Sequence, residues 1–188
     1  MKRFFISLLL VSRLAGASDE FAAEEQIENP DKIPASIIAL LAHKIDLAEL
    51  GCLESKLSDT LEAKRIYIGT QVKTFLVKPK SWCLCGVASC PMWIFQMRGQ
   101  AANRIWSTEG SAALEILDQK RNGYRRLREI SDTAGHGAES IWSWHGAKYE
   151  ETYRQVWTWN EQKKCRETEV SRLINGKLKN TANSCVPE

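Results

Sequence analysis

From residue 65 to residue 159 the chain is a succession of short runs rich in Ile, Val, Tyr, Phe and Trp, each ended by Gly, Pro, Asn or Ser. Runs of this kind are typical of β-strands. No helical stretch of crossover length separates them, which argues against a doubly wound parallel sheet. The pattern predicts a mainly β fold made of one antiparallel domain, either a meander or a sandwich. The predicted strands span 65–69, 72–78, 92–97, 103–108, 114–118, 124–130, 138–144 and 149–159.

The chain begins with the layout of a secretory signal peptide. Lys2 and Arg3 precede an apolar run of eight residues at 4–11, and small residues follow at 15–17, so we expect cleavage after Ala17. An uncleaved anchor is the alternative, but this apolar run is far shorter than the roughly 20 residues that a membrane-spanning helix needs. We therefore expect an exported mature protein that does not span the membrane.

The rest of the chain is expected to divide into an arm and a single domain. Residues 18–32 are rich in Glu, Asp and Ala, which predicts a flexible acidic arm. Residues 33–188 are expected to form the β-rich domain, which opens with a short helix at about 34–45 because apolar residues recur there at helical spacing. From about residue 161 the domain is expected to end in an irregular tail.

All six cysteines lie after the expected cleavage site, and an even number in an exported chain predicts disulfide bonds. The expected pairs are Cys85–Cys90, which closes a tight loop, Cys165–Cys185 across the tail, and Cys52–Cys83 by elimination. The alternative is a zinc site made of Cys83, Cys85, Cys90 and a histidine. Because this spacing lacks the paired C-x-x-C form, we expect a disulfide-stapled domain without a metal site.

The charge of the mature chain is balanced overall but divided along the sequence. After residue 17 there are 23 basic and 23 acidic residues, whereas a nucleic-acid-binding protein normally carries a basic surplus. Residues 18–64 carry 11 acidic and 4 basic residues, and residues 65–188 carry 12 acidic and 19 basic ones. We expect no nucleic-acid partner, and an acidic N-terminal segment that lies against the basic β domain. An anion-binding face on the basic part is the alternative.

Basic residues gather around the Asn122-Gly123 turn and predict a docking face. On the strand that follows, Tyr124, Arg126 and Arg128 share one face by alternation, and we expect them to meet a protein partner from solvent. Leu127 is expected to point inward. Its neighbour Arg125 would then need a partner, such as an acid from the N-terminal segment. The alternative for the predicted docking face is a charged strand surface that only meets water.

Seven tryptophans are many for a chain of this length. Trp142 with Trp144, and Trp157 with Trp159, are spaced so that each pair shares one face of a strand. The two strands could pair around the turn near Gly146 and stack these aromatic rings in the core. The alternative is that Trp142 and Trp144 form a platform for a cell-wall glycan or a partner loop.

Catalytic signatures are absent from the sequence after residue 17, which has no G-x-S-x-G, no H-E-x-x-H and no phosphate-binding glycine loop. His136 lies between two glycines with Asp132 and Glu139 nearby. These side chains provide the alternative of an exported wall-cleaving hydrolase. We expect a non-catalytic protein with no catalytic residue and no cofactor.

Three motifs of the sequence carry a resemblance to a known group of proteins. They are Cys85-Gly86-x-x-x-Cys90-Pro91-x-Trp93, Asn122-Gly123-Tyr124-Arg125 and Trp144-x-Gly146-x-x-Tyr149. Over residues 33–165 the chain resembles a group of small exported bacterial β-rich proteins, largely uncharacterised, that carry a C-G-x-x-x-C-P-x-W strand. It departs from the group at Arg126 and His145, where an Asp is usual, so the resemblance implies no acidic or calcium-linked role for these positions.

More distantly, the layout is similar to periplasmic lysozyme inhibitors and to immunity proteins against wall-degrading toxins. That similarity implies a bacterial, periplasmic or secreted protein that binds and neutralises a toxin or a lysozyme-like enzyme. A peptidoglycan-binding or other glycan-binding envelope module is the alternative function. An exported hydrolase is the third and least favoured hypothesis.

Overall fold

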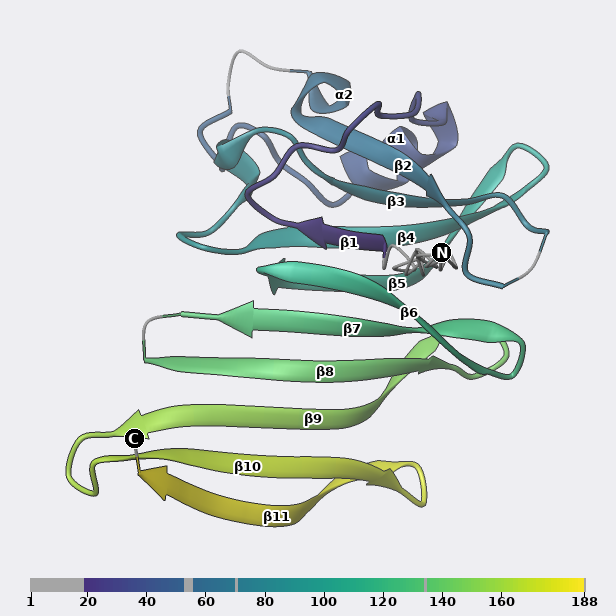
Figure 1. Ribbon diagram of the computed structural model, residues 1–188. Helices are drawn as coiled ribbons and strands as arrows, with labels where there is room; N and C mark the ends of the chain where they lie inside the picture. The colour runs from purple at the N-terminus through teal and green to yellow at the C-terminus, as the bar shows by residue number, and fades with distance from the viewer. Residues whose placement is uncertain (1–18, 53–55, 70, 134, 188) are drawn as a thin grey trace, which may run out of the picture.

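The computed structural model describes residues 19–52, 56–69, 71–133 and 135–187, so the expected signal peptide at 1–17 lies outside the described residues. The described chain forms two antiparallel sheets, two short α-helices and one short 3-10 helix (Figure 1). The predicted mainly β, antiparallel fold with a short helix near its start is therefore confirmed. Within the described residues, no helix is long and apolar enough to cross a membrane.

Strands that follow one another in the sequence pair within each sheet, and only the first strand leaves this order. The small sheet contains β2 (Leu61–Ile66), β3 (Thr74–Pro79), β4 (Cys90–Arg98) and β5 (Ala101–Ser111). The large sheet contains, from edge to edge, β1 (Asp19–Ala22), β6 (Ala113–Arg121), β7 (Tyr124–Asp132), β8 (His136–Trp144), β9 (Tyr149–Asn160), β10 (Cys165–Ile174) and β11 (Lys177–Pro187). The helices are α1 (Ala35–Ala42) and α2 (Leu57–Thr60), and the 3-10 helix spans Trp82–Leu84.

The small sheet is buried on both faces, and its strand β3 contributes side chains to a hydrophobic cluster on each face. Phe75 and Val77 point toward α1 and pack in one cluster with Ile37. Leu76 points the opposite way and packs in a second cluster that includes Leu127 of the large sheet. The fold therefore has helices over one face of the small sheet and part of the large sheet over the other.

Each of the eight predicted runs overlaps an observed strand, from β2 to β9, and α1 ends at Ala42, before the expected end at about 45. The C-terminal expectation was wrong, because residues from 165 onward form β10 and β11 rather than an irregular tail. Asn175 and Gly176 turn the chain between them with φ angles of 52° and 73°, which suit a tight hairpin. This Asn-Gly pair was the signal that the sequence analysis overlooked.

The acidic arm is attached to the domain along its length, which corrects the expectation of a flexible segment. Strand β1 pairs with β6, and the backbone N–H of Asp31 donates to Ala63. Lys78 is buried beneath the arm, where its ammonium group donates to the carbonyls of Ala23 and Glu25 and pairs with Glu62 at 3.0 Å. Because these contacts satisfy a buried cation, the arm is part of the folded domain.

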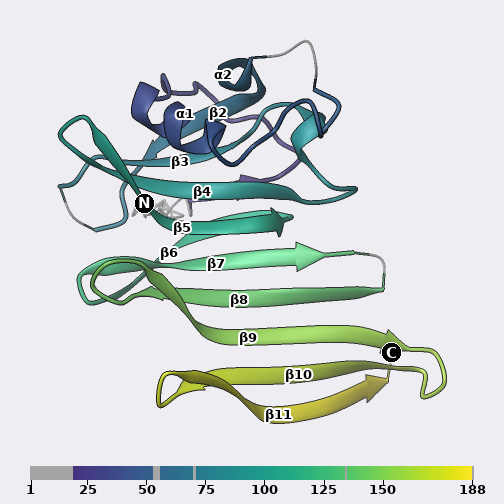
Figure 2. The same cartoon turned by 180° about the vertical axis from the view of Figure 1, so that it is seen from behind.

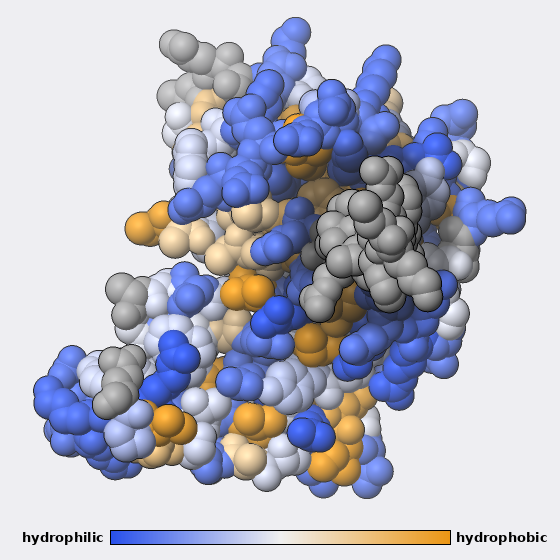
Figure 3. Space-filling model, viewed as in Figure 1, coloured by the Kyte–Doolittle hydropathy of each residue, from blue (hydrophilic) through white to orange (hydrophobic). Residues whose placement is uncertain are grey.

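Strands β9, β10 and β11 extend the large sheet beyond the small one. Figures 1 and 2, which view the molecule from opposite sides, show no other described element across either face of these strands. In the space-filling view, hydrophobic residues lie over this region as separate spots among hydrophilic ones (Figure 3). This part of the sheet therefore offers exposed faces that no other described part of the chain uses.

Candidate functional site

The six cysteines form the three predicted disulfide bonds, Cys52–Cys83, Cys85–Cys90 and Cys165–Cys185. Sulfurs joined in this way are not the thiolates that bind zinc, so the alternative zinc site at Cys83, Cys85 and Cys90 was wrong. The disulfides are compatible with an exported protein.

Two of these disulfides hold the segment that leads into β4. Cys52–Cys83 ties the loop after α1 to the 3-10 helix, and Cys85–Cys90 closes the short loop that follows. Inside that loop the backbone N–H of Gly86 donates to the carbonyl of Ser89 over 2.7 Å. Cys90 itself is buried as the first residue of β4, so the loop is anchored in the sheet at one end. This double anchoring restricts the conformations that the loop can adopt.

Three exposed apolar side chains lie close in sequence to the cysteines of these two disulfides. Val87, in the middle of the closed loop, is 103% exposed relative to a reference chain, and Trp82 and Leu50 are 55% and 49% exposed. Each lies within two residues of a cysteine of the two bridges. We call Leu50, Trp82 and Val87 the apolar tip. A rigid loop that presents uncovered apolar groups is suited to insertion into a pocket of another protein.

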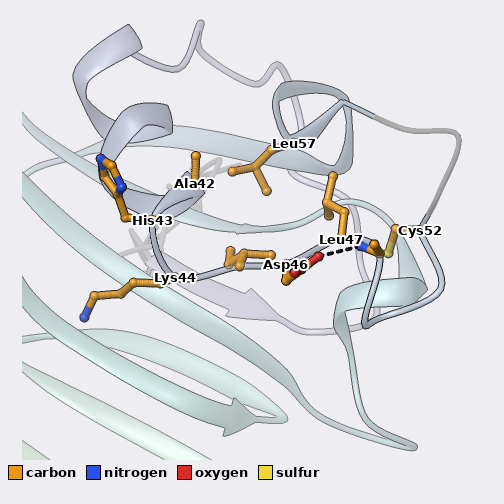
Figure 4. Close-up of a pocket in the computed structure, with 9 residues that line it drawn as sticks. Ala42, His43, Lys44, Asp46, Leu47, Cys52 and Leu57 are labelled. Carbon is orange, nitrogen blue, oxygen red and sulfur yellow. Dashed lines mark hydrogen bonds between the residues drawn. The ribbon is translucent and has the colours of Figure 1, made fainter.

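A hollow of about 620 Å³ lies beside the end of α1, next to Cys52 (Figure 4). Its lining includes His43, Lys44 and Asp46, which are the residues that a small-molecule site would use. However, the Asp46 carboxylate already accepts a hydrogen bond from the backbone N–H of Ala48. The side chains of His43 and Lys44 point away from Asp46 (Figure 4). Because its polar groups do not converge, we do not treat the hollow as a ligand site.

Three of the five predicted partner-binding residues pack against the core instead of facing solvent. Trp144 is buried, and its ring stacks on that of Tyr124 with a centroid distance of 4.0 Å. Trp142 packs edge-on against Trp106, and its indole N–H donates to Glu129. The predicted exposed roles of Tyr124, Trp142 and Trp144 were therefore wrong, because the small sheet covers the face of the large sheet that carries them.

The two remaining predicted residues, Arg126 and Arg128, lie on β7 with their guanidinium groups already bonded. Arg126 donates to the Gln119 amide oxygen over 3.1 Å. Arg128 bridges Glu115 and Glu139 at 3.3 and 2.9 Å, and the hydrogen bond to Glu139 is the main reason that its pKa is raised. A partner would have to compete with these bonds, which makes both residues weaker docking groups than the sequence indicated.

The neighbouring predictions on β7 are confirmed. Leu127 is fully buried. Arg125 pairs with Asp19 of the arm at 3.0 Å and also donates to the carbonyls of Ile116 and Leu117. The acidic N-terminal segment thus neutralises one base of the β domain, as its charge predicted.

The tryptophans of β9 do not stack on those of β8. In the hairpin, Trp157 lies opposite Gly137, whereas Trp144 lies opposite Tyr149 at the other end. Pairing of the two strands was predicted, but the predicted ring stacking was wrong because the turn places the two aromatic pairs at opposite ends of the hairpin.

Two side chains of the alternative hydrolase site have other partners. The Glu139 carboxylate accepts a hydrogen bond from Arg128, and the His136 ring contacts the Thr133 hydroxyl.

From the sequence, the loop between Cys85 and Cys90 was expected to be a structural staple, and Val87 was not among the predicted binding residues. The available signal was an apolar residue at the centre of a short loop between two paired cysteines, where its side chain cannot reach the core. Tyr153, Arg166 and Arg172, on β9 and β10, were also missed. In the sequence, Arg166 and Arg172 are an even number of residues apart, while Glu167 and Glu169 occupy odd offsets from them, so on a strand the bases and the acids would lie on opposite faces.

A scan against models of known protein families finds no match, and a search of curated proteins finds no significant match. Among solved structures, the chain has a likeness to a Xanthomonas type IV secretion system related protein, with a TM-score of 0.28 and 8% sequence identity. The aligned region covers 65% of this chain and 99% of that protein. A likeness at this level carries no argument about function, and the resemblance of the sequence to exported β-rich proteins stays a prediction.

Proposed function

We propose that this chain is a non-catalytic binding protein of the bacterial periplasm or the extracellular space. Its partner in this proposal is a wall-degrading toxin or a lysozyme-like enzyme, which it inhibits by inserting the apolar tip into the substrate cleft. The observation that carries the proposal is the full exposure of Val87 on a loop closed by Cys85–Cys90.

The energetic argument rests on rigidity and on apolar burial. Covering one exposed Val or Trp side chain contributes about 1.5 to 3 kcal/mol or more to binding before the costs of association. A flexible loop would lose part of this gain when it becomes ordered, whereas the Cys85–Cys90 bridge limits the loop before binding. Trp82, at the base of the loop, belongs to the residue types that dominate protein-binding hot spots.

The glycan-binding alternative receives less support from the same structure. Its candidate platform was Trp142 and Trp144, whose rings pack against the core. A sugar ring needs a free aromatic face, so binding there would require the two sheets to separate. We therefore retain the inhibitor or immunity function as the proposal.

The test is inhibition of purified wall hydrolases in a lysis assay. A panel of lysozyme-like enzymes and secreted wall-degrading toxins is mixed with the oxidised protein, and clearing of a cell-wall suspension is followed by turbidity. We expect at least one enzyme to be inhibited at a stoichiometric ratio. Val87→Asp should weaken this inhibition by about tenfold or more, because a carboxylate would enter an apolar pocket without a partner.

The matched control is Val186→Asp, which places the same charge on an exposed valine of β11. It should inhibit like the unchanged protein, and the unfolding temperatures of both variants should remain close to that of the parent. If no enzyme of the panel is bound or inhibited, the proposed function is wrong. If Val87→Asp inhibits as well as Val186→Asp, the apolar tip is not the inhibitory element.

A further inference from the structure

The second feature of interest lies at the other end of the large sheet, on the uncovered face of β9 and β10. Cross-strand register places Trp157 beside Thr168, and Tyr153 between Ile141 and Arg172. These residues lie on the face opposite to that of Trp142, which meets the core. We call this face the outer face. Its residues on β9 and β10 are Tyr153, Gln155, Trp157, Trp159, Arg166, Thr168, Val170 and Arg172.

Arginines cover the aromatic rings of the outer face. The Arg166 guanidinium carbon lies 4.2 Å from the centroid of the Trp157 ring, and that of Arg172 lies 6.0 Å from the Tyr153 ring. A guanidinium that stacks on an aromatic ring keeps its N–H groups free to donate in its own plane. Stacking also holds the arginine in one orientation, so little conformational freedom is lost when it binds a carboxylate.

The charges of β10 are sorted between its two faces. Arg166 and Arg172 lie on the outer face, while Glu167 and Glu169 alternate with Arg166 and point the other way. Lys179 of β11 lies directly opposite Arg172, so the two cations face each other across a strand pair. Like charges in such positions destabilise a sheet, and an anion bound between them would remove the repulsion.

This charge pattern limits what can cover the outer face. A symmetric pairing of two outer faces would bring two basic surfaces together, which is unfavourable. A sugar would meet the guanidinium group over the Trp157 ring at 4.2 Å rather than a bare ring. An acidic protein segment fits both Arg166, which lies over the Trp157 ring, and the exposed cation pair of Arg172 and Lys179.

We propose that the outer face of β9 and β10 is a docking surface for an acidic segment of a second protein, with Arg166 and Arg172 donating to its carboxylates. The surface is separate from the apolar tip, which lies beside the small sheet. The inference therefore does not depend on inhibition of a wall hydrolase.

The probe is a displayed library of random peptides, selected against the oxidised full-length protein. We expect enrichment of peptides rich in Asp and Glu with at least one aromatic residue. A synthetic copy of an enriched peptide should bind the parent protein at least about tenfold more tightly than the double variant Arg166→Glu, Arg172→Glu at low ionic strength. This difference should shrink as salt is raised, because salt screens exposed charges.

The matched control is Arg98→Glu with Arg104→Glu, which makes the same charge change on exposed arginines of the small sheet. It should bind the acidic peptide within about twofold of the parent, because the proposed contacts are made by Arg166 and Arg172 of the large sheet and not by arginines of the small sheet. A second pair, Arg166→Gln with Arg172→Gln, tests the surface if the glutamate variant does not fold. Selection without acidic enrichment, or equal peptide binding by the parent and the outer-face variants, would overturn the proposal.

Two further measurements separate this proposal from other occupants. Sedimentation velocity at low salt should show the same mass for the parent and the outer-face variant. Self-association that the variant abolishes would assign the face to a second copy and contradict the proposal. The protein could instead pellet with insoluble peptidoglycan in a way that depends on Arg166 and Arg172, and bind no peptide. That result would assign the outer face to a glycan and contradict the proposal as well.

Discussion

The indole of Trp157 lies on the backbone of Gly137, its cross-strand neighbour. A Cβ added to Gly137 would come within 2.5 Å of the indole Nε1 and 2.7 Å of Cε2, so no other residue fits beneath the ring in this position. Gly137 does not have a positive φ, so its role is to provide space and not to adopt an unusual backbone conformation. Because Gly137 has no side chain, the Trp157 ring can lie against β8, and Arg166 lies over this ring.

Gly137→Ala should therefore displace Trp157 and destabilise the protein by about 1 to 3 kcal/mol, the usual range for overpacking. Urea unfolding gives the stability, and near-ultraviolet circular dichroism should report a changed tryptophan environment. Gly135→Ala is the control, because an added Cβ there meets nothing within 4 Å. Equal stability of the two variants would show that the indole moves aside freely.

The buried ion pair between Lys78 and Glu62 should be a major determinant of stability. Both side chains are almost fully buried at 2% and 4% exposure, and Glu62 also accepts the backbone N–H of Ile27. Lys78→Met should lower the free energy of unfolding by about 3 to 5 kcal/mol, because it leaves a buried carboxylate unpaired.

The double variant Lys78→Met, Glu62→Gln should recover part of this loss in urea unfolding. Lys164→Met, which breaks an exposed pair with Glu161, provides the comparison and should change stability little. Destabilisation by Lys78→Met no greater than by Lys164→Met would contradict a structural role for the buried pair.

Glu129 should make stability fall as pH rises. Its burial raises its pKa above the ordinary 4.5, and the nearby Glu151 adds to the increase, while hydrogen bonds from Thr108 and Trp142 oppose it. The folded state therefore binds more protons than the unfolded state between pH 4.5 and the higher folded pKa. Over that window the free energy of unfolding decreases with increasing pH, and Glu129→Gln removes this contribution.

The stability of Glu129→Gln relative to the parent should thus increase as pH rises above 4.5, and it should level off once the pH has passed the raised pKa of Glu129 in the folded state. Glu167→Gln should show the opposite trend, because hydrogen bonds from Lys163 and Asn160 lower the pKa of Glu167. Its carboxylate contributes stability above its unfolded pKa, and this is lost as pH falls through the folded value. If both profiles change in the same direction, one of the two assignments is wrong, and if neither changes with pH, both are wrong.

The Cys165–Cys185 bridge should hold β11 on the sheet. Among the strands that the structure describes, β10 alone pairs with β11, and the bridge joins the two strands over a sequence separation of 20 residues. Replacing both cysteines by Ser should remove about 3 kcal/mol of stability in the chain-entropy account. Amide exchange should accelerate in β11 far more than in β3, which is buried throughout. The unchanged protein, denatured without reductant, should have close to no free thiol.

Strand β7 was predicted correctly from the sequence, whereas the last two strands were not. Alternation around Leu127 was enough to place it inside and to predict an acidic partner for Arg125, because a buried residue determines the direction of its neighbours along a strand. The three expected cysteine pairs are also the ones observed, although the number of cysteines alone allows 15 pairings and Cys52–Cys83 was expected only by elimination. Strands β10 and β11 were missed because they carry few apolar residues, and only the Asn175-Gly176 turn marked them.

The sequence by itself determined the strands between residues 65 and 159, the oxidised state expected for an even number of cysteines, and the sharing of one face by Trp142 with Trp144 and by Trp157 with Trp159. Only the tertiary structure decided which of these faces is covered. Side chains alternate between the two faces of a strand, so the sequence shows which residues share a face. The alternation is the same for both faces, so it does not show which face another layer will cover. The small sheet covers Trp142 and Trp144 and leaves the outer face of β9 and β10 uncovered by any described element, while the loop between Cys85 and Cys90 leaves Val87 exposed.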